Sequence, residues 1–111
     1  MFEKNMSIGF LLDFYGEILS ERKKNILDMY YNEDLSLAEI SNIVGISRQG
    51  VRDVIKKAET ELLFYEEKLG LAQRFTDIRS SADRISDMAH NAALPEALKQ
   101  EIQHLAQIAQ W

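Results

Sequence analysis

The feature that most constrains the fold of this chain is the stretch of residues 35–59, in which two amphipathic segments are separated by a very short break. Apolar residues recur at spacings of three and four on both sides of the break, which is typical of the buried face of a helix. Gly45 lies at the break, where a sharp turn needs a positive φ angle that glycine adopts at little cost. Ser47 is a suitable N-cap for the second helix, and Ser36 with Glu39 forms a capping box for the first. The apolar positions are Leu37, Ile40, Ile43 and Val44 before the break, and Val51, Val54, Ile55 and Ala58 after it. The stretch is therefore predicted to fold as a helix-turn-helix.

The second helix of this unit carries polar and basic side chains on the face opposite its apolar stripe. In a DNA-binding helix-turn-helix this helix enters the major groove, where Arg bonds guanine, Gln bonds adenine and Lys suits phosphate. The candidate contact residues are Arg48, Gln49, Arg52, Lys56, Lys57 and Lys23. The two arginines are expected at bases or phosphates, and the lysines at the backbone. Helix pairs joined by a glycine turn also occur in proteins that bind no nucleic acid, so a merely solvated outer face remains the alternative.

The charge distribution is uneven along the chain. The net charge of −5 opposes binding to nucleic acid, because affinity for nucleic acid comes largely from cations placed at phosphates. Residues 47–59, however, carry four basic and two acidic side chains, whereas residues 60–111 carry five basic and eight acidic ones. A second basic cluster, Arg22, Lys23 and Lys24, precedes the helix-turn-helix. The basic residues therefore gather near the predicted groove-binding face, a partial segregation that favours weak rather than tight binding.

Composition indicates a soluble all-α protein. The chain of 111 residues has one proline and no sustained alternation of apolar and polar residues. The absence of cysteine excludes disulfides and thiolate metal sites and fits a reducing compartment. No segment is long and apolar enough to span a membrane, and the N-terminus lacks the pattern of an export signal. We therefore expect a cytoplasmic protein.

Motifs that carry enzymatic chemistry are missing from the sequence. It holds neither a phosphate-binding glycine loop nor a nucleophile elbow. His90 and His104 stand alone, which favours surface histidines over ligands or bases. Asp83 and Asp87 lie one helical turn apart, where a pair of carboxylates can hold a hard cation, but a solvated face is the favoured interpretation. We expect a non-enzymatic protein with no catalytic residue, metal site or cofactor.

The remaining pattern predicts a succession of helices joined by short loops. They are expected over residues 8–19, 21–31, 37–44, 48–69, 71–89 and 95–109. Gly70 ends the long fourth helix, and a loop at residues 91–94 turns the last two helices into an antiparallel hairpin. We expect residues 1–60 to form a helical domain that contains the helix-turn-helix (36–58). Residues 61–111 are then a helical extension, packed on the same core or on a second copy.

The first predicted helix is apolar on more than one side. The residues of this helix that are candidates for an exposed apolar interface are Phe10, Leu11 and Phe14. Apolar surface of this kind usually marks an interface, and two-fold dimers are the commonest closed assembly. We therefore expect a homodimer with these three residues in its interface, while a monomer that folds its stripes on one another remains the alternative.

Residues 20–60 resemble the C-terminal promoter-reading domain of bacterial sigma factors. The pairs and single residues that carry this resemblance are, in order, Ser36-Leu37, Ser47-Arg48, Val51, Arg52 and Lys57-Ala58. The resemblance implies that Arg48, Gln49 and Arg52 face bases. Two departures weigh against tight, sigma-like reading of DNA: Gly50 replaces a longer side chain, and Asp53 brings a carboxylate to or near the groove-facing side.

Over its whole length the chain is similar to the YlxM-like proteins of Gram-positive bacteria, which are small helix-turn-helix proteins. Residues 10–59 and the following ELLFYEEKLGL carry this similarity. It implies a regulatory role in the signal recognition particle pathway. Two hypotheses follow: a nucleic-acid-binding regulator that contacts DNA or the signal recognition particle RNA, or a protein-interaction module that keeps the helix-turn-helix as a scaffold and binds a targeting-pathway protein.

Overall fold

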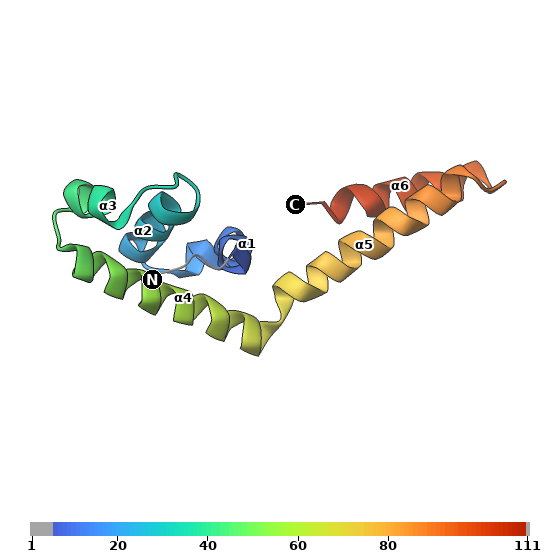
Figure 1. Ribbon diagram of the computed structural model, residues 1–111. Helices are drawn as coiled ribbons and strands as arrows, with labels where there is room; N and C mark the ends of the chain where they lie inside the picture. Colours follow the sequence, from blue (N-terminus) through green and yellow to red (C-terminus); the bar gives the residue numbers. More distant parts are fainter. Residues whose placement is uncertain (1–5, 111) are drawn as a thin grey trace. The chain divides into compact units, whose positions relative to one another are not determined.

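The computed structural model describes residues 6–110, and these residues are helical throughout apart from short connections (Figure 1). The elements are α1 (Met6–Tyr15), the short 3₁₀ helix η1 (Gly16–Ile18), α2 (Glu21–Tyr31), α3 (Leu37–Val44), α4 (Arg48–Leu69), α5 (Leu71–His90) and α6 (Glu96–Ile108). The all-α class is confirmed, as are the predicted bounds of α2, α3 and α4. None of the described helices is long and apolar enough to cross a bilayer.

The chain divides into two compact units, and the boundary between them in the sequence falls between Gly70 and Leu71. The division expected from the sequence, after residue 60, falls inside α4. The helix continues past that point because no breaker interrupts its apolar stripe before Gly70, whose φ angle of 63° ends it. Unit 1 therefore contains all of α4, and unit 2 contains only α5 and α6.

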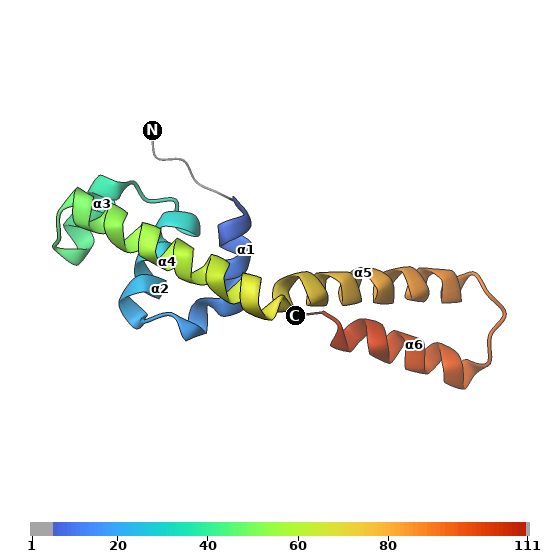
Figure 2. The same ribbon diagram turned by 90° about the horizontal axis from the view of Figure 1, so that it is seen from below.

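Unit 1 is organised around α4. The helices α1, α2 and α3 all pack on it and lie along the same side of it in Figure 1, and Figure 2 shows α4 in front of them when unit 1 is seen from below. Val51, Ile55, Ala58 and Leu62 form the inward stripe of α4, and each is fully buried. The facing helices bury Ile8, Leu11, Leu12, Tyr15, Leu19, Ile26, Leu27, Tyr30 and Ile40. The core of unit 1 is thus a single layer of apolar side chains, in which α1, α2 and α3 all pack against α4.

Local capping defines the helix-turn-helix. The Ser36 hydroxyl accepts a hydrogen bond from the Glu39 backbone N–H at 3.1 Å, and the Glu39 carboxylate accepts one from the Ser36 N–H at 3.0 Å. Gly45 follows α3 with a φ angle of 75°, and its N–H donates to the Ser41 carbonyl at 2.9 Å. Ser47 caps α4 by accepting from the Gly50 N–H at 2.9 Å. These contacts confirm the predicted capping box, glycine turn and second cap.

The first helix is shorter than predicted. Instead of one helix over residues 8–19, α1 ends at Tyr15 and a 3₁₀ turn leads towards α2. Gly16 at this point is buried, and a Cβ there would lie 3.3 Å from a methyl group of Leu12. Leu11 is buried within unit 1, Phe14 is half-buried, and Phe10 remains exposed. Because unit 1 already covers Leu11, α1 offers less apolar surface to a partner than its sequence indicates.

One expected core position of the helix-turn-helix lies outside. Ile43 was assigned to the apolar face of α3, but its side chain is 61% exposed, while Ile40 alone on this helix is buried. Leu37 and Val44 are half-buried. At about 100° per residue, Leu37 and Val44 lie on one side of Ile40 and Ile43 lies on the other, so the covered face of α3 includes Leu37 and Val44 but not Ile43.

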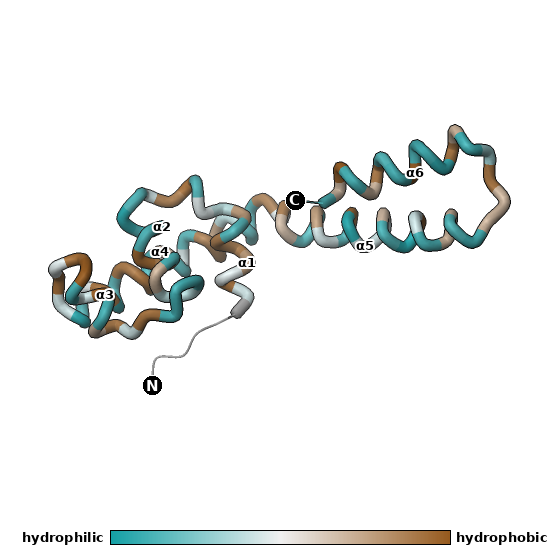
Figure 3. The backbone as a smooth tube through the Cα atoms, turned by 90° about the horizontal axis from the view of Figure 1, so that it is seen from above, coloured by the Kyte–Doolittle hydropathy of each residue, from teal (hydrophilic) through white to brown (hydrophobic). Residues whose placement is uncertain are grey.

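Unit 2 is a hairpin in which α5 and α6 contact each other. Pro95 precedes α6 as its N-cap residue, one position earlier than the first-turn place predicted for it. Figure 3 shows hydrophobic residues returning at each turn of α6. Among the described residues of this unit, 71–110, those that are buried are all alanines, namely Ala72, Ala82, Ala89 and Ala109.

Replacing Gly45 by Ala is expected to destabilise unit 1 by about 1 kcal/mol, because a Cβ raises the energy of the left-handed conformation. No atom lies within 4 Å of the added Cβ, so the effect reports backbone strain rather than a clash. Gly45→Asn is the matched control, since Asn tolerates this conformation better than Ala. Urea unfolding measures both variants; equal loss in both would contradict the assignment.

The capping box is expected to make stability depend on acid. Hydrogen bonds from Ser36, that of its backbone first, hold the pKa of the Glu39 carboxyl below its ordinary value of 4.5. A carboxyl whose folded pKa is lowered adds stability above its ordinary pKa and loses that contribution as the pH falls through the folded value. The stability difference between the wild type and Glu39→Gln, in favour of the wild type at neutral pH, should therefore shrink below about pH 4.5. A difference that stays constant with pH would exclude this role.

Candidate nucleic-acid interface

The first half of α4 presents a polar surface on the side away from its buried stripe. At about 100° per residue, Gln49, Asp53, Lys56 and Thr60 point roughly opposite to Val51. All four outward residues are exposed. This is the side that a recognition helix turns towards a groove, and it belongs to unit 1 alone.

The structure distributes the six predicted contact residues unequally. Arg48, Gln49, Lys56 and Lys57 are exposed, whereas Arg52 and Lys23 are half-buried. Arg52 follows the buried Val51 directly, which places it at the side of the helix rather than opposite the stripe. It also has an interaction within the chain. Among residues 6–110, no hydrogen bond or ion pair engages the side chains of Arg48, Lys56 or Lys57.

Gln49 and Asp53 form a pair on the outward surface. The Gln49 amide donates to the Asp53 carboxylate at 3.0 Å, one helical turn away. A base that used Gln49 would first have to replace this bond, and a phosphate would meet the negative charge of Asp53. Asp53, one of the two departures from the sigma-factor pattern, therefore lies in the middle of the candidate surface.

Three lysines from two helices converge beside this surface. Lys23 of α2 lines an open hollow of about 370 Å³ together with Lys56, Lys57, Thr60 and Glu61 of α4. Lys23 is paired with Glu61 at 2.9 Å. The structure thus brings the three lysines predicted from separate segments to one place. Sequence analysis missed Thr60 and Glu61, although both follow Lys56 and Lys57 by one helical turn, the spacing that places side chains on one face.

Other carboxylates of α4 are engaged within unit 1. Tyr15 of α1 donates its hydroxyl to Glu66 at 2.6 Å. Tyr31 of α2 donates its hydroxyl to Glu59. With Glu61 held by Lys23, three acidic residues of α4 serve as attachment points for the helices that cover it. Asp53 differs from them because its carboxylate accepts from a neighbour on the outward side of the same helix.

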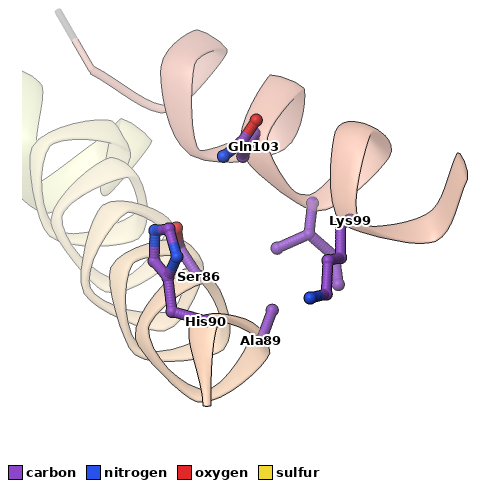
Figure 4. Close-up of a pocket in the computed structure, with 6 residues that line it drawn as sticks. Ser86, Ala89, His90, Lys99 and Gln103 are labelled. Carbon is purple, nitrogen blue, oxygen red and sulfur yellow. The ribbon is translucent and has the colours of Figure 1, made fainter. Parts of the chain in front are cut away.

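Unit 2 also holds a polar hollow, of about 390 Å³, lined by Asp83, Ser86, Gln103, Ala106, Gln107 and Gln110, and no lysine or arginine is among these residues. The hollow in Figure 4 lies between α5 and α6 and is lined by Ser86, Ala89, His90, Lys99, Ile102 and Gln103. Its volume of about 20 Å³ is enough for a water molecule. The Asp83 carboxylate accepts from the Gln110 amide at 3.1 Å. Within residues 6–110, no three His, Asp or Glu side chains gather in a way that could hold a metal ion.

Comparison with known proteins identifies relatives over almost the whole chain. A family model described as "Putative helix-turn-helix protein, YlxM / p13 like" matches residues 2–105. A UPF0122 protein of Thermoanaerobacter sp. (strain X514) is 51% identical over 75 residues, 68% of this chain and 64% of the relative. Relatives from Clostridium kluyveri and Clostridium perfringens are 45% identical over 85 residues (77% of each chain) and 39% identical over 101 residues (90% of each chain). The chain thus covers slightly less than two thirds of the length of the Thermoanaerobacter relative.

Removal of the two arginine side chains is expected to affect stability differently. Arg48→Ala should change the free energy of unfolding by less than about 0.5 kcal/mol, as is usual for exposed positions. Arg52→Ala should lower it by about 1 kcal/mol, because a half-buried stem and an internal interaction are lost. Urea unfolding of both variants measures the difference. Equal stability would mean that Arg52 is as available to a ligand as Arg48.

Proposed function

The chain belongs to the YlxM / p13-like family of helix-turn-helix proteins, and on this basis we propose that it is a nucleic-acid-binding regulatory protein of the signal recognition particle pathway. The observation that carries the nucleic-acid part is the surface of α4. There Lys56 and Lys57 line the hollow that Lys23 completes, and within residues 6–110 no hydrogen bond or ion pair engages the side chains of Arg48, Lys56 or Lys57. The pathway part rests on the family resemblance.

The proposed contacts divide into two groups. Arg48 lies in the first turn of α4, where a recognition helix meets base edges, and is assigned a base or phosphate contact. Lys56 and Lys57 are assigned the phosphate backbone, which lysine binds as a point charge. Lys23 is assigned a secondary backbone contact, because it is paired with Glu61. Arg52 and Gln49 are assigned secondary base contacts, since each would first have to give up an interaction within the chain.

Two nucleic acids are candidates. Duplex DNA is favoured by the geometry, since α4 starts directly after the glycine turn and presents its outer side to solvent. The signal recognition particle RNA is favoured by the pathway. With a net charge of −5, the protein is expected to bind either one with modest, strongly salt-dependent affinity.

A second candidate function is a protein-interaction module that binds a targeting-pathway protein. Asp53 favours it, because this carboxylate occupies the middle of the groove-facing side and already holds Gln49. In this alternative the helix-turn-helix is a scaffold, and its outer surface meets a protein rather than phosphates. In both cases we propose a non-enzymatic, cytoplasmic protein.

We also propose that the protein acts as a homodimer. A helix-turn-helix dimer presents two recognition helices about 34–36 Å apart, one turn of duplex DNA. Two equivalent sites would compensate for the small number of unpaired cations in one copy.

Titration of duplex DNA and of signal recognition particle RNA at two salt concentrations is expected to show binding that weakens steeply with salt. Lys57→Ala should weaken binding to all sequences and reduce the salt dependence by about one counterion. Lys99→Ala removes the same charge from unit 2, which contributes no residue to this surface, so it should leave the affinity unchanged. Arg48→Ala should cost about 1–3 kcal/mol and relax sequence preference if Arg48 contacts a base.

Two results would contradict the nucleic-acid proposal. One is no appreciable binding of either nucleic acid at low salt, which would leave the protein-interaction module. The other is unchanged binding in the double variant Arg48→Ala and Arg52→Ala, which would remove the first turns of α4 from the contact surface.

A further inference from the structure

The α5–α6 hairpin leaves its large apolar side chains uncovered. Among residues 71–110 only alanines are buried. Phe75 is 37% exposed, and six further large apolar residues are between 41% and 72% exposed. They are Ile78, Ile85 and Met88 of α5, and Leu98, Leu105 and Ile108 of α6. A pair of helices of this length rarely buries enough surface to be stable by itself. The hairpin is therefore expected to need a partner.

On α5 the uncovered residues lie on one side of the line of contact with α6. Ala82 marks this line, because it is buried. At about 100° per residue, Asp83 and Ser86 lie on one side of Ala82, and Ile78 and Ile85 lie on the other. Asp83 and Ser86 line a polar hollow shared with α6. The apolar side of α5 is thus turned away from that hollow.

The same division holds on α6. The buried Ala109 marks the contact line, and Gln103 and Gln110 on one side of it line the polar hollow. Leu105 and Ile108 lie on the other side. The two helices are antiparallel, and each turns one side to the same hollow. Their uncovered residues consequently share the opposite face, here named the apolar face.

Two opposite charges stand on this apolar face. Arg74 lies in the first turn of α5, at the open end of the hairpin, and projects from the same side of the helix as Ile78. Glu101 lies near the start of α6, towards the loop end of the hairpin, and projects from the same side of the helix as Leu105 and Ile108. Both side chains are exposed, and within residues 6–110 no hydrogen bond or ion pair engages either of them. The apolar face therefore carries a positive charge at one end and a negative charge at the other.

This pattern is complementary to itself when one copy is reversed. Stacking two hairpins in the same direction would bring Arg74 towards Arg74 and Glu101 towards Glu101. Stacking them in opposite directions brings Arg74 of each copy to the end that holds Glu101 of the other. Unlike charges then meet at both ends, and the six apolar residues of each copy cover those of the other.

We propose that the apolar face docks a second copy of the same hairpin, reversed and two-fold related, so that four helices form a bundle with Arg74 of each copy beside Glu101 of the other. Four-helix bundles bury apolar stripes of this spacing in their centre. The twelve side chains would bury on the order of 1,200 Å², the lower bound of a standard specific interface. The dimer is accordingly concentration-dependent. The inference specifies the homodimer proposed above and is independent of nucleic-acid binding.

The first test measures the mass of the full chain by sedimentation or light scattering over a range of concentrations. The mass should rise from 12.8 kDa towards twice that value. Ile85→Glu should remain monomeric at concentrations at which Gln107→Glu, which adds the same charge on the polar side of α6, is dimeric. A constant 12.8 kDa up to high micromolar concentration would overturn both the homodimer and the interface. Dimers that survive Ile85→Glu would overturn this interface alone.

The second test is a charge swap, which does not rely on core residues and so preserves the helices. Arg74→Glu and Glu101→Arg should each weaken dimerisation by about tenfold or more, because like charges then meet. The double variant should recover an affinity close to the wild type. Failure of the double variant to recover, after each single change weakens the dimer, would overturn the reversed arrangement. None of these positions belongs to the α4 surface, so nucleic-acid affinity of a single copy is a separate readout.

Discussion

Burial of the α4 stripe is the interaction on which the rest of unit 1 depends. Val51, Ile55, Ala58 and Leu62 step along the helix by four, three and four residues, so they stay on one side for three turns. Three shorter helices obtain their hydrophobic cover from this one line. Since the covering helices occupy only the inward side, the opposite side of α4 is left to solvent, and the position of a candidate binding surface follows from core packing.

The same arrangement explains how an acidic protein keeps a locally basic surface. Glu59, Glu61 and Glu66 accept hydrogen bonds from Tyr31, Lys23 and Tyr15, which belong to the covering helices. Glu59 and Glu66 are thereby engaged by tyrosines of α2 and α1, whereas Glu61 stays in the lysine hollow, where it pairs with Lys23. The side chains of Lys56 and Lys57 have no hydrogen-bond or ion-pair partner among the described residues. Net charge alone is therefore a poor guide to this surface.

The two units differ in what they leave unsatisfied. Unit 1 buries a core of large side chains and exposes cations, which suit a charged partner, besides large apolar residues such as Phe10, Ile43 and Phe64. Unit 2 buries little apolar surface, because the alanines at the contact between its two helices bring these helices together but remove little apolar area from water. Its remaining surface suits an apolar partner with matching ends. One short chain thus carries two surfaces of different chemistry, on separate units, and neither needs the other's residues.

Helix bounds and caps could be read from the sequence because they depend on neighbours in the chain: Gly45 needs only its own φ angle, and Ser36 needs only Glu39 three residues on. The helix-turn-helix and the exposed arginine at position 48 followed in the same way. Burial of Leu11, exposure of Ile43 and the division at Gly70 were decided by tertiary structure, because each depends on which helices lie opposite. The convergence of Lys23 with Lys56 and Lys57 was decided there too, since residues far apart in sequence meet only when α2 packs on α4. Periodicity tells which residues share a face of one helix, and only packing tells which of those faces another helix covers.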